Sequence, residues 1–336
     1  MRFRLISTLA LLSNCCTSQA LSSRPERSLP LAEGTAEWRD LVFSTGYACC
    51  GMALALLCLA LPCSAAKKPA AWVVAIQPSR VVNGSPLLVE VTPPQPLKSL
   101  SGKWLGHDVF FSAQTSGHAW YGLAGVGVDE HPGRVALELR GITAKGDATS
   151  FERKVQIHKA KYQRIAVTVP TKYTEPSPAD LEQINADKAL KAQVLSRIGP
   201  EREWSGKFAA PVKASISDVF GTARTFNGQT QSVHQGLDYG VPQGTPVMAV
   251  NRGTVLLAQI LFFEGNCVVL DHGQGLLTIY MHLSKLEVKP GERVERGQQI
   301  GLSGGTGRAS GPHLHLAARW QGVYVDPAAL LALRMP

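Results

Sequence analysis

Short apolar runs broken by glycine and proline turns recur along most of this chain, and they limit the folds that it can adopt. Runs such as Leu87–Val91, Val135–Leu139 and Pro246–Val250 alternate apolar and polar residues or are rich in β-branched side chains. Runs of this kind, when turn residues bound them, are typical of β-strands. The sequence therefore predicts a mainly β protein.

Residues 67–166 carry such runs at regular spacing, and turn sequences such as Asn83-Gly84 and Pro132-Gly133 separate them. Several short strands within about a hundred residues favour an immunoglobulin-like β-sandwich. Trp104 and Trp120 are large side chains that suit the core of such a domain. We therefore expect an N-terminal β-domain over residues 67–166.

Residues 167–210 differ from their surroundings, because they contain the one pattern that favours a helix. Ser177 suits a helix N-cap, Pro178 suits the first turn, and Gly199-Pro200 suits the end. This segment is predicted to be a linker with a helix at about 178–198. From residue 211 to 336, short strands with glycine turns return, which predicts a second β-domain.

The first 66 residues carry two apolar segments. Leu5–Ser13 follows two arginines and resembles a short signal peptide, and residues 41–66 hold no charged side chain. Ser64 and Ala66 suit cleavage before Lys67, which predicts export to the periplasm or the exterior. One explanation accounts for both segments: the true start codon lies inside the chain, near Val42 or Met52, and the upstream part is a translation artefact. The alternative to cleavage is that residues 41–66 remain as a membrane anchor across the ~30 Å of a bilayer.

The charge and the cysteines restrict the function further. The formal net charge of +9 is spread along the chain, without a basic run interleaved with aromatic residues. This distribution argues against a nucleic-acid partner and favours an anionic polymer or an envelope surface. Of the seven cysteines only Cys267 lies beyond residue 63, so the predicted domains fold without an internal disulfide. The apolar run around Cys267 predicts a buried strand.

A group of four histidines and one aspartate in the C-terminal domain carries the chemistry. They are His234, Asp238, His282, His313 and His315. Neutral imidazole and carboxylate groups suit zinc, and a catalytic zinc site takes three protein ligands and leaves one position for water. Because there are more candidates than three, some are expected to act as bases. This excess points to a hydrolase.

The local pattern indicates how these residues approach one another. The period around them is two rather than 3.6, so His234 and Asp238 are expected to meet across a turn, where Gly236 lets the backbone bend closely. His313 and His315 are two residues apart and share one face of a strand. The glycine-rich stretch 301–311 lacks the ending of a phosphate loop and is expected to shape a substrate groove. His272 is read as a turn residue.

Together these residues resemble a known family. His234-x-x-x-Asp238, Tyr280-Met-His282 and Gly311-Pro-His313-Leu-His315 are similar to the motifs of the LytM/lysostaphin-type zinc metallopeptidases, which cleave peptidoglycan peptides. The resemblance runs from about residue 215 to 330. It implies one zinc ion per chain, with His234, Asp238 and His315 as its ligands. It also implies that His282 and His313 are the catalytic pair that holds and deprotonates the water.

The function expected from this resemblance is that of a zinc endopeptidase that hydrolyses peptide cross-links of bacterial peptidoglycan in the cell envelope. Which bond is cut stays open, whether a D-alanyl–diaminopimelate link of the stem peptides or a glycine bridge. The alternative is a noncatalytic envelope protein that binds cell wall, or regulates another wall hydrolase, through its β-sandwich. Fold alone does not decide between them.

Overall fold

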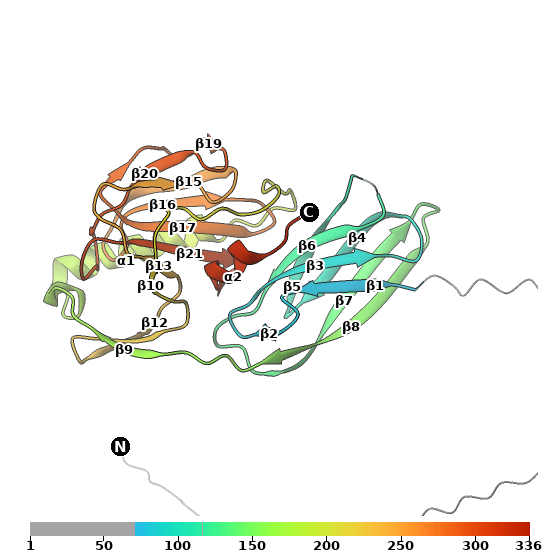
Figure 1. Cartoon of the computed structure of the whole chain (residues 1–336), viewed down its shortest axis with the longest axis horizontal. Coiled ribbons are helices and arrows are strands. Elements are labelled where there is room, and N and C mark those ends of the chain that lie inside the picture. The colour runs from blue at the N-terminus through green and yellow to red at the C-terminus, as the bar shows by residue number, and fades with distance from the viewer. Residues whose placement is uncertain (1–70, 116) are drawn as a thin grey trace, which may run out of the picture. The chain divides into compact units, whose positions relative to one another are not determined.

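The computed structural model describes residues 71–115 and 117–336. The predicted signal segments, the alternative start and the possible anchor over 41–66 lie outside these residues. Within them no helix is both long and apolar enough to cross a membrane. The prediction of a mainly β chain with one linker helix is confirmed (Figure 1).

The N-terminal part is one sheet of eight strands. They are β1 (Val73–Gln77), β2 (Val81–Val82), β3 (Pro86–Thr92), β4 (Leu97–Trp104), β5 (His107–Ala113), β6 (Trp120–Gly125), β7 (Gly133–Thr143) and β8 (Ala148–His158). Their hydrogen-bonded order is β1-β3-β6-β5-β4-β7-β8-β2. The sheet curls into a near-barrel whose core includes the buried side chains of Val91, Trp104, Leu139 and Ile157.

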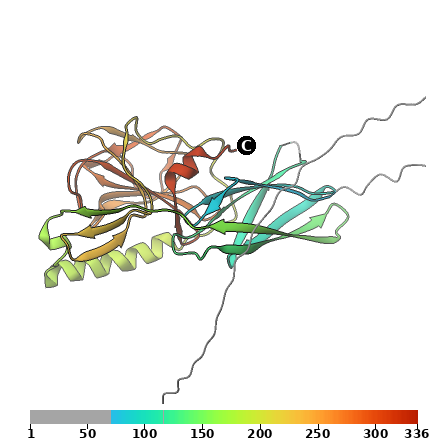
Figure 2. The same cartoon turned by 60° about the horizontal axis from the view of Figure 1, so that its bottom comes forward.

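The linker contains the predicted helix. After β9 (Arg164–Val167) and the 3-10 turn η1 (Thr171–Tyr173), α1 spans Pro178–Leu195 and ends before the expected Ile198. Its start matches the sequence signals: the Ser177 side chain accepts from the backbone N–H of Asp180, whose side chain accepts from the N–H of Ser177. Figure 2 shows α1 as one uninterrupted helix.

The C-terminal part is built on a second sheet of eight strands. They are β10 (Ile216–Asp218), β13 (Leu237–Tyr239), β15 (Gly253–Leu261), β16 (Gly265–Asp271), β17 (Leu276–Leu283), β19 (Arg293–Val294), β21 (Leu314–Trp320) and β22 (Val323–Val325). The order is β10-β13-β21-β17-β16-β15-β19, and β22 pairs with β21. All pairings in it are antiparallel.

Strand β16 explains why this sheet is covered on both faces. Val268 and Leu270 join the main core, whereas Cys267 and Val269 point to the other face and join a second apolar cluster. The apolar residues Leu190, Val194 and Leu195 of α1 pack against that second cluster. Cys267 is therefore a buried strand residue, as expected, and burial raises the pKa of its thiol.

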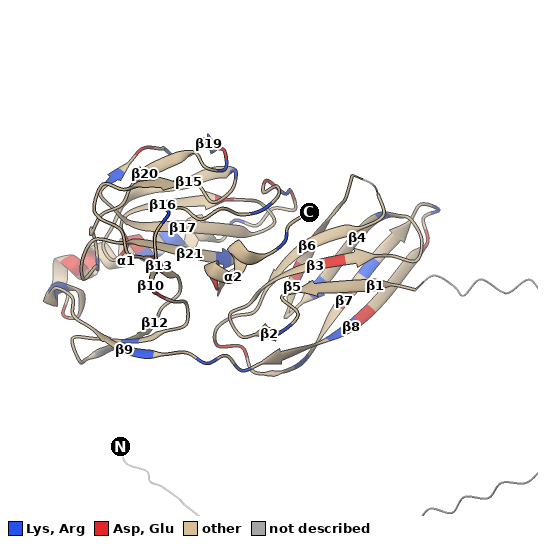
Figure 3. Ribbon diagram, viewed as in Figure 1, with Lys and Arg blue, Asp and Glu red and all other residues tan. Residues whose placement is uncertain are grey.

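Two small sheets and a short helix complete the fold. One sheet has the order β12 (Thr230–Val233), β11 (Ala223–Phe226) and β9, and the other has β14 (Pro246–Met248), β20 (Gln299–Leu302) and β18 (Lys285–Leu286). The final helix is α2 (Pro327–Ala332), capped by Asp326. Along the described chain, basic and acidic residues are spread over both β-rich parts, as the sequence indicates (Figure 3).

Contacts also join the N-terminal strands to the C-terminal sheet. Gly125, at the end of β6, lies so close to Trp320 and Val325 that a Cβ atom on it would come within 3.1 Å and 2.8 Å of them. The Gln321 side chain donates to the backbone carbonyl of Asp108 at 2.5 Å. The chain between residues 71 and 336 thus packs as one compact unit.

Candidate functional site

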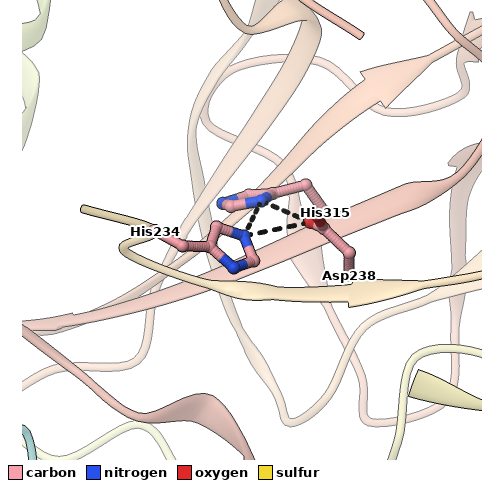
Figure 4. A group of neighbouring side chains, drawn as sticks. All are labelled: His234, Asp238 and His315. Atoms are coloured by element: carbon pink, nitrogen blue, oxygen red, sulfur yellow. Dashed lines mark hydrogen bonds and ion pairs between the residues drawn. The ribbon is translucent and has the colours of Figure 1, made fainter. Parts of the chain in front are cut away.

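Three of the five residues that the sequence singled out converge on one point. Strand β13 pairs with β21, and the register sets Asp238 directly opposite His315. His234 follows β12 and reaches the same point across the turn that contains Gly236 (Figure 4). His234 Nε2 lies 3.1 Å from Asp238 Oδ1 and 3.0 Å from His315 Nδ1, and His315 Nδ1 lies 2.7 Å from Asp238 Oδ1.

This arrangement depends on a close approach of the backbone at Gly236. A Cβ atom at this position would lie 2.3 Å from His315 Nε2 and 2.7 Å from the carbonyl oxygen of Leu316. Only glycine leaves room there for the imidazole of His315. The turn between His234 and Asp238 therefore needs a glycine because the imidazole of His315 occupies the space beside it.

The donor set suits a metal ion. His234 Nδ1 donates to the carbonyl oxygen of Val219 at 2.9 Å, which leaves the Nε2 lone pair directed at Asp238 and His315. The three candidate ligand atoms all lie within 4.8 Å of one another, and all three residues are buried. Their mutual distances approach the ~3.3 Å edge of a tetrahedron with bonds of about 2.0 Å. His234, Asp238 and His315 form a metal site.

Asp238 is held as an anion from both of its oxygens. Oδ1 faces the ring nitrogens of the two histidine ligands, and Oδ2 is bonded to the guanidinium of Arg224. Arg224 also donates to Asp218 Oδ2, at 2.8 Å from Nε and 2.5 Å from an Nη. Burial raises the pKa of Asp238, but the hydrogen bonds from His234 and His315 outweigh it and hold that pKa far below its usual range. Burial lowers the pKa of His315.

The other two histidines form a facing pair beside the ligands. The ring centroids of His282 and His313 are 4.7 Å apart, and His313 Nε2 lies 3.9 Å from Asp238 Oδ1. His282 Nδ1 donates to the carbonyl oxygen of Thr306 and His313 Nδ1 to that of Gly311, both at 2.8 Å. In the neutral tautomer that these bonds favour, each ring carries its lone pair on Nε2.

An irregularity in β17 places His282. Asn266 pairs with Leu283 and Val268 with Tyr280, so β17 carries one more residue than β16 over this stretch. His282 lies in the resulting bulge with a φ of 63°, in the left-handed region that residues other than glycine rarely adopt. Burial lowers the pKa of His282 to about 3, and the nearby His313 and His315 contribute to the shift. The ring is thus neutral at ambient pH.

The glycine-rich stretch 301–311 lies beside this group, as expected. Arg308 of this stretch lines two adjoining cavities. One cavity contains His234, His282 and His315, and the other contains Asp238, His282 and His313. The two cavities flank the metal site.

Sequence reasoning identified all five of these residues but missed others. It assigned no role to Arg224 or Asp218, since nothing in their spacing shows that both meet Asp238. His272, read as a turn residue, is fully buried next to its turn and bonded to Arg252 O and Thr278 Oγ1, both at 2.7 Å.

Comparison with known proteins agrees with this geometry. Residues 232–327 match the sequence profile of peptidase family M23. The chain is 51% identical over 82 residues to the peptidoglycan DD-endopeptidase ShyA of Vibrio cholerae, covering 24% of this chain and 19% of that protein. It is 40% identical over 119 residues to the DD-carboxypeptidase/endopeptidase Mpg of Neisseria meningitidis. This match covers 35% of this chain and 27% of that protein. The chain thus spans less than a third of the length of these relatives.

A solved structure extends the similarity to the N-terminal strands. The structure of an M23 peptidase from Pseudomonas aeruginosa superposes with a TM-score of 0.58 at 29% sequence identity. The match covers 75% of this chain and 95% of that one, which is more than the C-terminal part alone can supply. The additional β-domain is therefore part of the shared architecture.

Proposed function

This chain belongs to peptidase family M23 through its C-terminal domain, and from that premise we propose that it is a zinc endopeptidase that hydrolyses peptide cross-links of peptidoglycan. The observation that carries the proposal is the convergence of His234, Asp238 and His315 beside the free Nε2 atoms of His282 and His313. Two imidazoles and a carboxylate are a ligand set typical of catalytic zinc. When bound, zinc supplies a Lewis acid that polarises the scissile carbonyl and lowers the pKa of water toward about 7.

The proposed role of His282 and His313 is proton transfer. Because each donates its Nδ1 hydrogen to a backbone carbonyl, each offers Nε2 to the water molecule or to the substrate. In the reaction the water oxygen bonds to the carbonyl carbon and the amide C–N bond breaks. One imidazole accepts the proton that water loses, and a protonated imidazole delivers a proton to the departing amine. The same imidazolium stabilises negative charge on the carbonyl oxygen.

The substrate class follows from the relatives. Two of the curated relatives are a peptidoglycan DD-endopeptidase and a DD-carboxypeptidase/endopeptidase. We therefore propose that this chain cuts amide bonds between D-configured centres of cross-linked stem peptides, and that it does so in the cell envelope. The predicted export segment agrees with this location. A role of the β-domain in binding envelope proteins remains a prediction.

The proposal is tested by incubating the purified chain, loaded with one equivalent of zinc, with peptidoglycan sacculi. The expected result is release of uncrosslinked muropeptides, which chelation stops and added zinc restores. An Asp238→Ala variant is expected to bind no zinc and to release nothing. If the zinc-loaded chain releases no new peptide termini while Asp238→Ala still differs from it in zinc content, the metal site is real but the endopeptidase proposal is wrong.

A further inference from the structure

Arg308 lines both cavities beside the site histidines, and no residue that the structure describes forms an ion pair with it. We refer to these two cavities together as the groove. Its guanidinium carbon lies 4.5 Å from the ring centroid of Phe226 and 4.8 Å from that of Phe263. Within residues 71–115 and 117–336, the structure shows no hydrogen bond or ion pair to this side chain. Aromatic faces stabilise a guanidinium but leave its N–H groups unsatisfied. Those donors are available to a ligand.

The other charges of the same groove are already paired. Arg224 is shared between Asp218 and Asp238, and Lys191 of α1 lies 2.5 Å from Glu264. Glu264 is the carboxylate whose charge acts on Arg308, but its bonded oxygen is committed to Lys191. Arg308 is thus the one cation lining the first cavity that has no ion pair among the described residues.

The loop that carries Arg308 is fixed against the turn between β15 and β16. The backbone N–H of Arg308 donates to Phe263 O at 2.8 Å, and the N–H of Asn266 donates to Thr306 Oγ1 at 2.9 Å. A Cβ atom on Gly307 would lie 2.3 Å from the backbone nitrogen of Gly265, so the two segments are in close contact. Thr306 also accepts the Nδ1 hydrogen of His282. The guanidinium is therefore set in a defined position relative to a histidine of the proposed catalytic pair.

We propose that Arg308 is a specificity-determining residue that binds a free carboxylate of the substrate, carried by the carbon atom attached to the scissile amide nitrogen. The inference rests on the proposed endopeptidase function. A guanidinium recognises a carboxylate through paired N–H donors, and such charge-assisted hydrogen bonds are strong where the surroundings are partly buried. In a D-alanyl–diaminopimelate cross-link, that carbon does carry a free carboxylate. In a glycine bridge the corresponding carbon carries two hydrogens and an amide carbonyl, and it has no free carboxylate.

The assignment selects between the two substrate types that the sequence left open. Recognition of a carboxylate next to the scissile bond favours cross-links of stem peptides over glycine bridges. It equally favours a terminal D-alanyl–D-alanine, whose carboxylate occupies the same position. The groove is thus expected to accept both endopeptidase and carboxypeptidase substrates, provided that this carboxylate is free.

The test uses two synthetic cross-linked peptides that differ only at this carbon, one with a carboxylate and one with a carboxamide. The zinc-loaded chain is expected to cleave the carboxylate form with a kcat/KM about 10- to 100-fold higher. Arg308→Gln is expected to lose that preference through a slower reaction with the carboxylate form, while cleavage of the carboxamide form changes by less than about threefold. Arg308→Lys is expected to restore part of the preference.

Arg293→Gln is the matched control, because Arg293 lies exposed on β19 in a hollow that contains none of the site histidines. It is expected to leave both rates unchanged. Zinc content and thermal unfolding of each variant show whether the loop remains folded. An equal loss on both peptides in Arg308→Gln, or an absence of preference in the unaltered chain, would overturn the inference.

A binding measurement keeps this inference separate from the proposed function. If the zinc-loaded chain cleaves neither peptide, calorimetric titration with the same two peptides still tests the carboxylate contact. Tighter binding of the carboxylate form, lost in Arg308→Gln, supports the contact although the endopeptidase proposal has failed. Equal binding of the two forms overturns the contact as well.

Discussion

The guanidinium of Arg224 is bonded to the carboxylate oxygen of Asp238 that does not face the histidines. This bond leaves Oδ1 for His234 and His315 and fixes the plane of the carboxylate. Asp218 accepts from the same Nη atom and from the neighbouring Nε of this guanidinium. The metal site is therefore supported by a side chain that does not itself reach the metal position.

Removal of Arg224 is expected to weaken metal binding. Arg224→Ala leaves Asp218 and Asp238 without their shared cation, and the freed carboxylate is no longer oriented. Loss of such an outer partner typically lowers metal affinity about 10- to 100-fold. Competition with a zinc chelator measures the affinity. Arg224→Gln, which retains a donor, is expected to lose less. A higher zinc affinity in Arg224→Ala would show that charge repulsion outweighs orientation, against this prediction.

Gly236 and Gly240, on either side of β13, form a pair for a substitution test. Gly236→Ala sets a methyl group 2.3 Å from His315 Nε2, so the imidazole or the strand has to move. We expect lost zinc binding and a free energy of unfolding lower by about 2 kcal/mol or more. Gly240→Ala meets only Ser217 Cβ at 3.7 Å and is expected to keep the zinc. Metal analysis and denaturant unfolding of both variants measure the difference, and equal behaviour would contradict it.

His282 is expected to matter for turnover but not for metal content. His282→Ala removes the proposed proton carrier and leaves the three ligands in place, so zinc remains at one per chain. Loss of a general acid or base typically slows a reaction about 10²- to 10⁴-fold. Zinc analysis and muropeptide release, measured on the same preparation, separate the two effects. His131→Ala, at an exposed turn before β7, is the control. Unchanged release from His282→Ala would remove this residue from the reaction.

His272 is expected to make the stability of the fold depend on pH. Burial lowers its pKa from the ordinary 6.5 to about 4, so below pH 6.5 the unfolded chain takes up a proton that the folded chain refuses. The contribution of the neutral, buried His272 to the free energy of unfolding is complete above pH 6.5 and is lost as the pH falls to 4. At 1.36 kcal/mol per unit of pKa it is on the order of 3 kcal/mol.

Denaturant unfolding of the metal-free chain and of His272→Gln, compared between pH 7 and pH 4, isolates this contribution. Other titrating groups act equally on both proteins, so the difference between the two curves belongs to His272. The unaltered chain is expected to lose more free energy of unfolding than the variant over this interval. If the free energy of unfolding changes equally with pH in the two proteins, protonation of His272 does not destabilise the fold and the prediction is wrong.

The parts of the fold that the sequence predicted are those that local residues determine. Alternation with a period of two identified the strands, and Ser177-Pro178 identified the start of α1 because a cap and a proline act within one turn. The five site residues were identified because their types and spacings are chemically unusual. The expectation that His234 and Asp238 meet across a glycine turn agrees with the structure.

The remaining features depend on contacts between distant segments. The bulge in β17 directs His282 toward the site. It arises from the pairing of β17 with β16, which no local sequence pattern shows. The near-barrel depends on the parallel pairing of β2 with β8, where Val81 meets Ile157. Arg224 is an ordinary strand residue in the sequence, and only the fold brings it to Asp238.

The histidines of the site are oriented mainly by the main chain. Three of the four donate Nδ1–H to peptide carbonyls, those of Val219, Thr306 and Gly311. A peptide carbonyl is present whatever side chain stands at that position, so no single exchange of a side chain deletes one of these acceptors. The backbone conformation of three loops therefore determines which nitrogen of each of these histidines carries the hydrogen. Substitutions at Val219, Thr306 or Gly311 can therefore change the side chains around the groove while the histidine tautomers stay the same.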